Sequence, residues 1–261
     1  MVTFSLLSFL KMNKLIYSGC FAGQPLLFDF RYAGTAFYFG IFLNSAEQSD
    51  ERSVCETVKV SDKAFDEWNQ DWQAPHNAFT EYSLSIYPVT DHLLKYGACA
   101  FHSAAFLWRG KAWLFTADSG VGKSTQLRNL VSLYDDEVKI MNGDKPLLKL
   151  EESGGISVFP SPWRGKENWG NDQLTATLGG VILLKQGKEN NIKRVQPLDC
   201  TAMLISQVFS LFEKEESVHS ACRIIETMLE TVPVWKLTNL GDLDSTRMVY
   251  NTLLAQERGS E

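Results

Sequence analysis

One short stretch of the sequence has the residues that hold phosphate groups. Residues 117–125 read ADSGVGKST, and the general phosphate-loop pattern is G-x-x-x-x-G-K-[ST]. Its glycines allow backbone N–H groups to wrap around a phosphate, and its lysine adds a positive charge. Ala117 replaces the first glycine, a difference of one methyl group. We predict that nucleotide phosphates bind to Asp118, Ser119, Gly120, Val121, Gly122, Lys123, Ser124 and Thr125.

The segments on both sides of this loop support the prediction. An apolar run at 113–115 is typical of a strand, and apolar residues recur with a helical period over 127–134. A loop between a strand and a helix directs the positive end of the helix dipole at the phosphates. The Ser124 hydroxyl would then be a ligand of Mg²⁺. The alternative is an ordinary glycine-rich turn that caps a helix.

Asp144 is the acidic residue that such a loop needs. It follows a short apolar strand predicted at 138–141, the next element after the helix of the loop. An aspartate in this place binds Mg²⁺ or receives a proton in phosphoryl-transfer enzymes. We therefore predict a catalytic and a metal-binding role for Asp144. The alternative is a turn aspartate, since Asn142-Gly143-Asp144 is also favourable turn chemistry.

Three other polar residues are weaker candidates. Arg164 and Lys166 lie in the basic segment PWRGKE and could neutralise charge on a transferring phosphoryl group, or they could be a solvated basic loop. If Arg164 has that function, Arg164→Ala loses far more activity than nucleotide affinity. His102 opens the strand that leads toward the loop, although a lone histidine is more often structural.

The pattern of the whole chain predicts an α/β fold. Residues 1–80 are predicted to form an N-terminal β-rich region with strands near 15–17, 26–30 and 37–43. A loop-rich connection follows, which could include one short helix. Residues 81–261 hold the phosphate loop. There we expect a helix near 85–96, a hairpin of 98–108 with 112–116, strands at 138–141, 179–184 and 232–237, and helices at 202–212, 221–229 and 242–254. The continuous run at 179–184 is predicted to be buried on both faces.

Composition excludes several classes of protein. The 261 residues carry 25 Lys and Arg against 31 Asp and Glu, a net charge of −6, so no nucleic-acid partner is expected. No apolar stretch is long enough for a membrane span. Residues 1–10 lack the features of a secretory signal, and Met12 reads as a natural start. Five widely spaced cysteines form no disulfide or zinc pattern and suggest a reducing cytoplasm.

The phosphate loop and its surroundings resemble HPr kinase/phosphorylase. That family also has a histidine upstream of the loop, as His102 is here. The stretches FHSAA at 101–105, NGDKP at 142–146 and SPWRGKE at 161–167 are closer still to the HPr-kinase-like proteins of bacterial peptide-modification clusters. Some of those relatives phosphorylate a serine of a lasso-peptide precursor. The resemblance extends over roughly two-thirds of the chain, from about Tyr82 to Tyr250.

This resemblance implies a P-loop kinase domain over 81–261, with ATP and Mg²⁺ as cofactors. The fold would be the mixed, strongly twisted β core with flanking helices that HPr kinase shares with ATP-dependent phosphoenolpyruvate carboxykinase. His102 would lie near the phosphates, and Asp144 would be the base or a metal ligand. HPr kinases usually carry two adjacent acids here, so either Asp144 serves both functions or Glu167 shares them. The C-terminal segment that recognises HPr is not visible, so HPr is not the expected substrate.

The resemblance therefore favours an ATP-dependent kinase that phosphorylates a serine of a peptide or protein. A small-molecule kinase on the same fold is the second hypothesis, and a nucleotide-binding regulator without an acceptor is the third. A carboxykinase is a fourth, which would need further metal-binding residues. HPr kinases form hexamers, so a homo-oligomer is a possible state.

Overall fold

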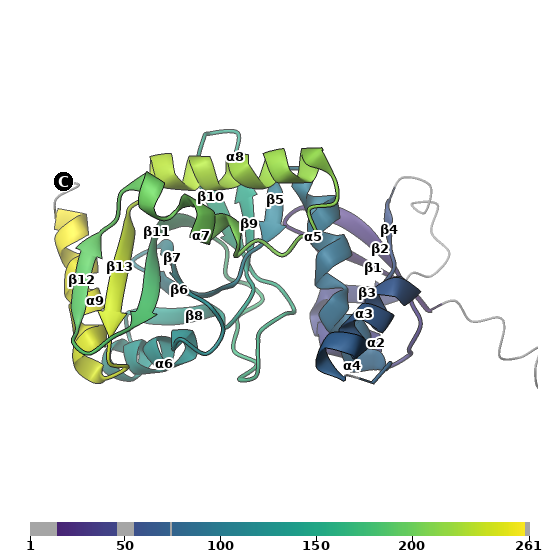
Figure 1. Ribbon diagram of the computed structural model, residues 1–261, viewed down its shortest axis with the longest axis horizontal. Helices are drawn as coiled ribbons and strands as arrows, with labels where there is room; N and C mark the ends of the chain where they lie inside the picture. Colours follow the sequence, from purple (N-terminus) through teal and green to yellow (C-terminus); the bar gives the residue numbers. More distant parts are fainter. Residues whose placement is uncertain (1–14, 46–54, 74, 259–261) are drawn as a thin grey trace, which may run out of the picture. The chain divides into compact units, whose positions relative to one another are not determined.

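The computed structural model describes residues 15–45, 55–73 and 75–258, and the chain divides after Val89 into two compact units (Figure 1). The division falls inside helix α5 (Ile86–Leu94), whereas the sequence suggested a boundary after residue 80. Pro88 lies in the first turn of α5, where a missing N–H costs no helical hydrogen bond. The expectations for the first residues, including Met12 as a start, lie outside the described part of the chain.

The first unit contains a four-stranded sheet. Its strands, in order across the sheet, are β3 (Leu43–Ser45), β1 (Leu15–Phe21), β2 (Gln24–Phe30) and β4 (Thr57–Val58). The β1–β2 turn is tight because Ala22 and Gly23 both adopt positive φ, at 49° and 80°. Aromatic side chains pack together against the sheet and form the centre of this core: Phe21, Phe28, Phe30 and Phe39.

Helices make up more of the first unit than the sequence suggested. The strand predicted at 37–43 is wrong: helix α2 (Thr35–Phe39) and a 3₁₀ turn, η1 (Gly40–Phe42), occupy most of it. Thr35 and Phe39 are the buried residues of α2, and a spacing of four is helical. Within the expected loop, α3 (Asp62–Trp72) has 11 residues and is capped by Ser61, while α4 (Ala78–Leu84) begins at its end.

A mixed sheet forms the second unit and positions the phosphate loop. Its main path runs β5 (Ala98–Ala100), β9 (Leu147–Leu150), β10 (Ile156–Phe159), β11 (Ala176–Gln186), β7 (Lys111–Thr116), β6 (Ser103–Trp108) and β8 (Val138–Asn142). Strand β13 (Val234–Asn239) also pairs with β11, and β12 (Asn191–Arg194) pairs with β13. Strands β7 and β13 are both parallel to β11, and the other pairs are antiparallel.

Helices cover both faces of this sheet (Figure 1). Along β11, Val181 and Leu183 belong to one hydrophobic core, which also holds residues of α7 (Thr201–Ile205) and α8 (Glu215–Thr231). Ile182 and Leu184 belong to the other, with α6 (Lys123–Tyr134) and α9 (Leu243–Arg258). The continuous apolar run is therefore buried on both faces, as predicted. The α/β class with a mixed sheet and flanking helices is confirmed.

Two departures from the predicted elements matter for the site. The expected strand 98–108 is broken, because β5 pairs with β9 whereas β6 pairs with β7 and β8. His102 lies at this break. The expected helix 202–212 is wrong beyond Ile205, because Val208 forms an isolated β-bridge with Phe101. This bridge brings the segment after α7 next to His102.

Candidate active site

The phosphate loop lies where the sequence predicted, between strand β7 and helix α6. Gly120 and Gly122 have φ values of 81° and 117°, a region that residues with a Cβ rarely adopt. The helix begins at Lys123, so its free N–H groups face the loop. Ala117 is 1% exposed and its methyl group packs in the core under α6. The missing first glycine is therefore accommodated by packing.

Lys123 is held inside the loop. Its Nζ donates to the carbonyl oxygens of Ala117 at 2.9 Å and Asp118 at 3.3 Å. The residue is 8% exposed, and burial lowers the pKa of Lys123, while the charge of Asp144 opposes that shift. The amine is therefore positioned among backbone groups that a phosphate could replace as its partner.

Asn142, at the end of β8, builds the turn that presents Asp144. Its side chain is buried, and its Oδ1 accepts from the N–H groups of Asp144 at 2.9 Å and Lys145 at 2.8 Å. Its Nδ2 donates to the carbonyl oxygen and the hydroxyl of Ser161, both at 3.1 Å. A Cβ on Gly143 would lie 2.7 Å from the carbonyl oxygen of Arg164, so only glycine fits between the two loops.

The Asp144 carboxylate has two side-chain partners, an imidazole and an ammonium group. His102 Nε2 lies 3.5 Å from Oδ1, and the Lys145 ammonium forms an ion pair with Oδ2. Burial alone would raise the pKa of Asp144, but His102 and Lys145 outweigh it and lower the pKa to about 2. Asp144 is therefore ionised throughout the physiological range.

Gln207 orients His102 from the opposite side. Its Oε1 lies 3.2 Å from His102 Nδ1, and its backbone carbonyl accepts from the His102 N–H at 2.8 Å. Gln207 is 4% exposed, and its Nε2 donates to the Ser206 hydroxyl at 3.0 Å. The imidazole thus lies between an amide and the Asp144 carboxylate, which fixes the direction of both ring nitrogens.

A cavity of about 340 Å³ brings most of the predicted residues together. Those that line it are His102, Ser119, Gly120, Gly122, Lys123, Ser124, Thr125, Asp144, Lys166 and Glu167. The cavity therefore joins an amine, hydroxyls, carboxylates and an imidazole from four separate segments of the chain. Asp118 and Val121 line a neighbouring cavity instead.

Arg164 is not among the residues that line this cavity. Its guanidinium forms an ion pair with Asp172, and both side chains are about four-fifths buried. Glu167 lies 3.9 Å from Arg128 of α6, whose guanidinium also stacks on Trp169. Lys166 is exposed at the cavity edge. Of the two basic candidates, Lys166 is thus the one beside the phosphate loop.

Sequence reasoning missed Asn142, Lys145 and Gln207. Asn142 lies two positions before Asp144 and Lys145 follows it directly, so the turn chemistry of the segment could have indicated them. Gln207 is separated from His102 by 105 positions and lies in a segment predicted as helix, so no local pattern indicates it.

The donor set fits a nucleotide with Mg²⁺. Among the described residues, no group of three or more His, Cys, Asp or Glu side chains could hold a metal ion by itself. Mg²⁺ bound with a nucleotide does not need such a group, because phosphate oxygens and waters complete its shell. Ser124 and Asp144, which both line the cavity, carry the kind of hard oxygen atom that it prefers. The N–H groups at the start of α6 and the Lys123 ammonium group are donors of the kind that phosphates require.

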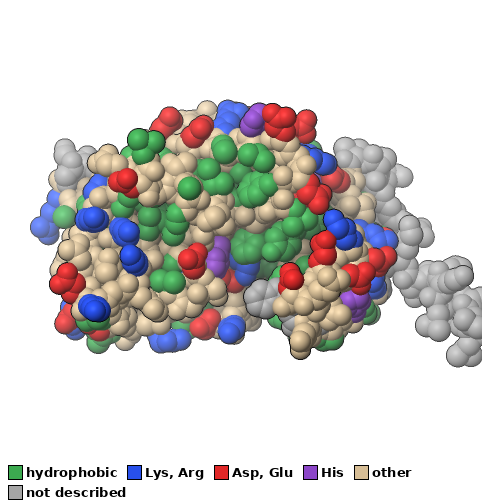
Figure 2. Space-filling view, viewed as in Figure 1, with side chains coloured by type: hydrophobic (Ala, Val, Ile, Leu, Met, Phe, Trp, Pro, Cys, Tyr) green, Lys and Arg blue, Asp and Glu red, His purple; other side chains and the backbone are tan. Residues whose placement is uncertain are grey.

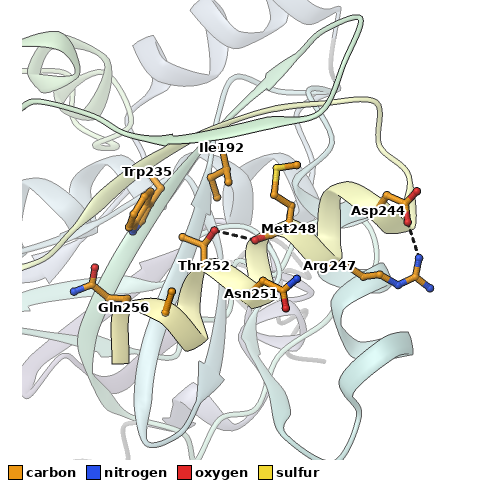
Figure 3. Close-up of a pocket in the computed structure, with 9 residues that line it drawn as sticks. Ile192, Trp235, Asp244, Arg247, Met248, Asn251, Thr252 and Gln256 are labelled. Atoms are coloured by element: carbon orange, nitrogen blue, oxygen red, sulfur yellow. Dashed lines mark hydrogen bonds and ion pairs between the residues drawn. The ribbon is translucent and has the colours of Figure 1, made fainter. Parts of the chain in front are cut away.

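A second hollow, of about 610 Å³, lies between α9 and strands β12 and β13 (Figure 3). Figure 3 shows Asp244 and Arg247 turned toward one another at one end. Arg247 Nη1 donates to Asp244 Oδ1 at 2.7 Å. The Thr252 hydroxyl donates to the backbone of Met248 at 2.9 Å. These polar groups already have partners within the helix. The hollow is therefore a weaker candidate for an active site than the cavity at the phosphate loop.

No family profile matches the chain, and no curated protein matches it. The structure of the Hpr(Ser) kinase/phosphatase from Coxiella burnetii aligns with 60% of this chain and 98% of its own, with 13% sequence identity and a TM-score of 0.36. Within the described residues, no helix has both the length and the apolar character that a membrane span requires.

Proposed function

We propose that the chain is an ATP-dependent kinase that transfers the γ-phosphoryl group to a hydroxyl. One observation carries the proposal: Lys123 and Ser124 of the phosphate loop line the same cavity as the ionised Asp144 and its partner His102. A phosphate-holding loop alone would support nucleotide binding. The carboxylate beside it adds a group that can accept the hydrogen of an incoming hydroxyl.

The loop and α6 would hold the phosphates, with Lys123 on the β- and γ-phosphates. Ser124 and Asp144 would hold Mg²⁺, which supplies positive charge against the phosphate oxygens. Asp144 orients the acceptor hydroxyl for attack in line with the leaving group. The new bond joins the acceptor oxygen to the γ-phosphorus, the bond to the β–γ bridging oxygen breaks, and the hydroxyl proton passes to the Asp144 carboxylate.

A carboxylate with a pKa of about 2 is a weak base. In a loose phosphoryl-transfer transition state, however, most catalysis is positioning and electrostatics, so a strong base is not required. His102 and Lys145 hold the Asp144 carboxylate in place. Lys166 and Glu167 also line the cavity, and Lys166 would stabilise charge on the transferring group.

We propose a serine of a peptide or protein as the acceptor. The stretches 101–105, 142–146 and 161–167 resemble those of peptide-modifying kinases, and residues from all three line or support the cavity. A small-molecule hydroxyl remains the second candidate, because the same groups would serve it.

The test uses purified protein with γ-labelled ATP, Mg²⁺ and a mixture of serine-containing peptides, with matched peptides in which alanine replaces serine. We expect label in the serine peptides alone. Label in small alcohols but in no peptide would support the second candidate. Nucleotide binding without transfer to any hydroxyl would contradict the kinase and support a regulator.

A further inference from the structure

Another cavity, distinct from the hollow at α9, borders the phosphate loop, and Asp144 does not line it. It measures about 690 Å³, and Asp118 and Val121 of the loop form part of its wall. At its edge, Gln186 Nε2 donates to the carbonyl oxygen of Gly120 at 3.5 Å. The carboxyl end of β11 therefore connects this cavity directly to the loop. We call it the lysine cavity, after Lys185, Lys193 and Lys236, which line it.

The positions of the three lysines do not stabilise the fold. Lys193 of β12 and Lys236 of β13 lie directly opposite one another in the strand register. Like charges in such a pair destabilise a sheet. In the described part of the chain, none of the three has a carboxylate oxygen within 4.0 Å of its ammonium group. Figure 2 shows Lys and Arg side chains gathered over the region where Figure 1 draws β11 and β12.

Arg194 differs from these lysines, although it also lines the cavity. Its guanidinium lies 5.5 Å from the centre of the Trp235 ring, and its Nη1 donates to Gln256 at 3.4 Å. The Arg194 guanidinium therefore already has partners on the α9 side of the sheet. The three lysines provide the positive charge for a ligand, and they outnumber the two carboxylates of the lining, Asp118 and Asp199.

The chemistry of the cavity fits an acidic chain better than the nucleoside of ATP. A nucleoside is uncharged and gains from stacking on rings, whereas the apolar wall here consists of aliphatic side chains such as Leu183, Val195 and Met203. The phosphates of ATP already have Lys123 and the loop. The whole chain carries a net charge of −6 and would repel an anion, so a local group of lysines is what would allow an acidic ligand to dock.

We infer that the lysine cavity binds an acidic segment of the phosphoacceptor peptide, with Asp or Glu carboxylates on the lysine ammonium groups. This inference rests on the proposed kinase function and specifies its substrate. An extended peptide advances roughly 3.3 Å per residue. Because both cavities border one loop, a serine beside Asp144 and acidic residues a few positions away can occupy the two cavities together.

A binding experiment without ATP tests this inference independently of catalysis. The probe is a dye-labelled peptide with one serine and a neighbouring run of glutamates, and its partner has glutamines in place of the glutamates. Fluorescence anisotropy measures Kd for the wild type, for the double variant Lys193→Gln/Lys236→Gln and for Lys139→Gln. Lys139 is an exposed lysine of β8 outside both cavities, so its variant is matched in charge.

We expect the glutamate peptide to bind more tightly than the glutamine peptide. The double variant should weaken it about tenfold, which corresponds to two partly screened ion pairs, and Lys139→Gln should leave it unchanged. Added salt should weaken binding to the wild type. This salt measurement needs no variant, so it also tests the inference if the double variant fails to fold.

Equal binding of the two peptides, or an unchanged Kd in the double variant, would overturn the inference. ATP is titrated separately into the wild type and the double variant. A loss of ATP affinity with unchanged peptide affinity would also overturn the inference and assign the cavity to the nucleotide. If the variant loses peptide binding but the wild type transfers no phosphate, the acidic site stands and the kinase proposal fails.

Discussion

Two carboxylates, one in each unit, show how differently a buried acid can be used. Glu81 of the first unit is 1% exposed and accepts from the backbone N–H groups of Arg31 at 2.7 Å and Tyr32 at 3.1 Å, and from the Thr35 hydroxyl at 2.6 Å. Asp144 of the second unit is 20% exposed and pairs with His102 and Lys145.

Glu81 and Asp144 differ in the groups that they bind and in whether the carboxylate faces a cavity. Glu81 satisfies backbone groups where β2 ends and α2 begins, so its bonding capacity serves the fold. Asp144 is held by side chains and turns toward a cavity that also contains Lys123 and Ser124. Burial alone therefore does not indicate a functional acid. A carboxylate that is fixed by side chains and still open to a cavity is the better candidate for a functional acid.

The largest expected effect comes from Asp144→Asn. Because the amide cannot accept the hydroxyl proton as the carboxylate does, phosphoryl transfer should fall by about 10²–10⁴-fold. Nucleotide affinity should change far less, since Lys123 and α6 remain. Transfer of labelled phosphate and nucleotide titration measure the two effects. Asp135→Asn, at the exposed end of α6, is the control of equal charge. Full activity in Asp144→Asn would mean that Asp144, like Glu81, has no catalytic role.

Gln207→Ala gives the next effect in size. Loss of the amide frees the His102 ring to rotate away from Asp144, and kcat should fall about 10- to 100-fold, as for other lost outer partners of catalytic groups. Gln207→Glu keeps an acceptor for His102 Nδ1 and should restore most of the rate. Steady-state kinetics should place the loss in kcat and leave KM for ATP nearly constant. An exposed glutamine, Gln173, supplies the matched alanine control.

Gln207 also illustrates how far the sequence could predict this site. The phosphate loop is contiguous, and its glycines and lysine each have a direct chemical reason, so nine residues were enough to predict it. Asp144 followed from an apolar strand of the right spacing. Gln207 depends on the chain leaving the helical path after Ile205 to pair Val208 with Phe101. That pairing is a tertiary contact, and the helical period of the apolar residues pointed the other way.

The N-terminal unit shows the same limit in its aromatic residues. Residues 37–43 are rich in β-formers, yet α2 forms because Phe39 packs on Phe21 and Phe28 while Thr35 donates to Glu81. Propensity in a short segment is weaker than such contacts. The long strand β11 was predicted because its burial on both faces is visible in the sequence itself.

Glu81→Gln tests the structural half of the comparison. The amide keeps one acceptor oxygen but turns an NH₂ group toward donors, so the free energy of unfolding should fall by about 1–3 kcal/mol. Chemical denaturation measures this change. Transfer per folded molecule should stay the same. Glu67→Gln is the control, because its ion pair with Lys63 is exposed and contributes little. If Glu81→Gln lowered phosphoryl transfer but not the free energy of unfolding, Glu81 would have a functional role.

The smallest effect concerns acid stability. The folded-state pKa of Asp144 is about 2, below its ordinary value of 3.8, so its ionised form stabilises the fold above pH 4 and that stabilisation is lost as pH falls toward 2. At pH 3 the loss should be about 1 kcal/mol relative to pH 7. Urea unfolding of the wild type and Asp144→Asn at both pH values isolates this contribution. The stability difference between the two proteins should move by that amount in favour of the variant at pH 3. A difference that does not change with pH would mean that His102 and Lys145 do not stabilise the Asp144 carboxylate, and the orientation proposed for the acceptor hydroxyl would lose its basis.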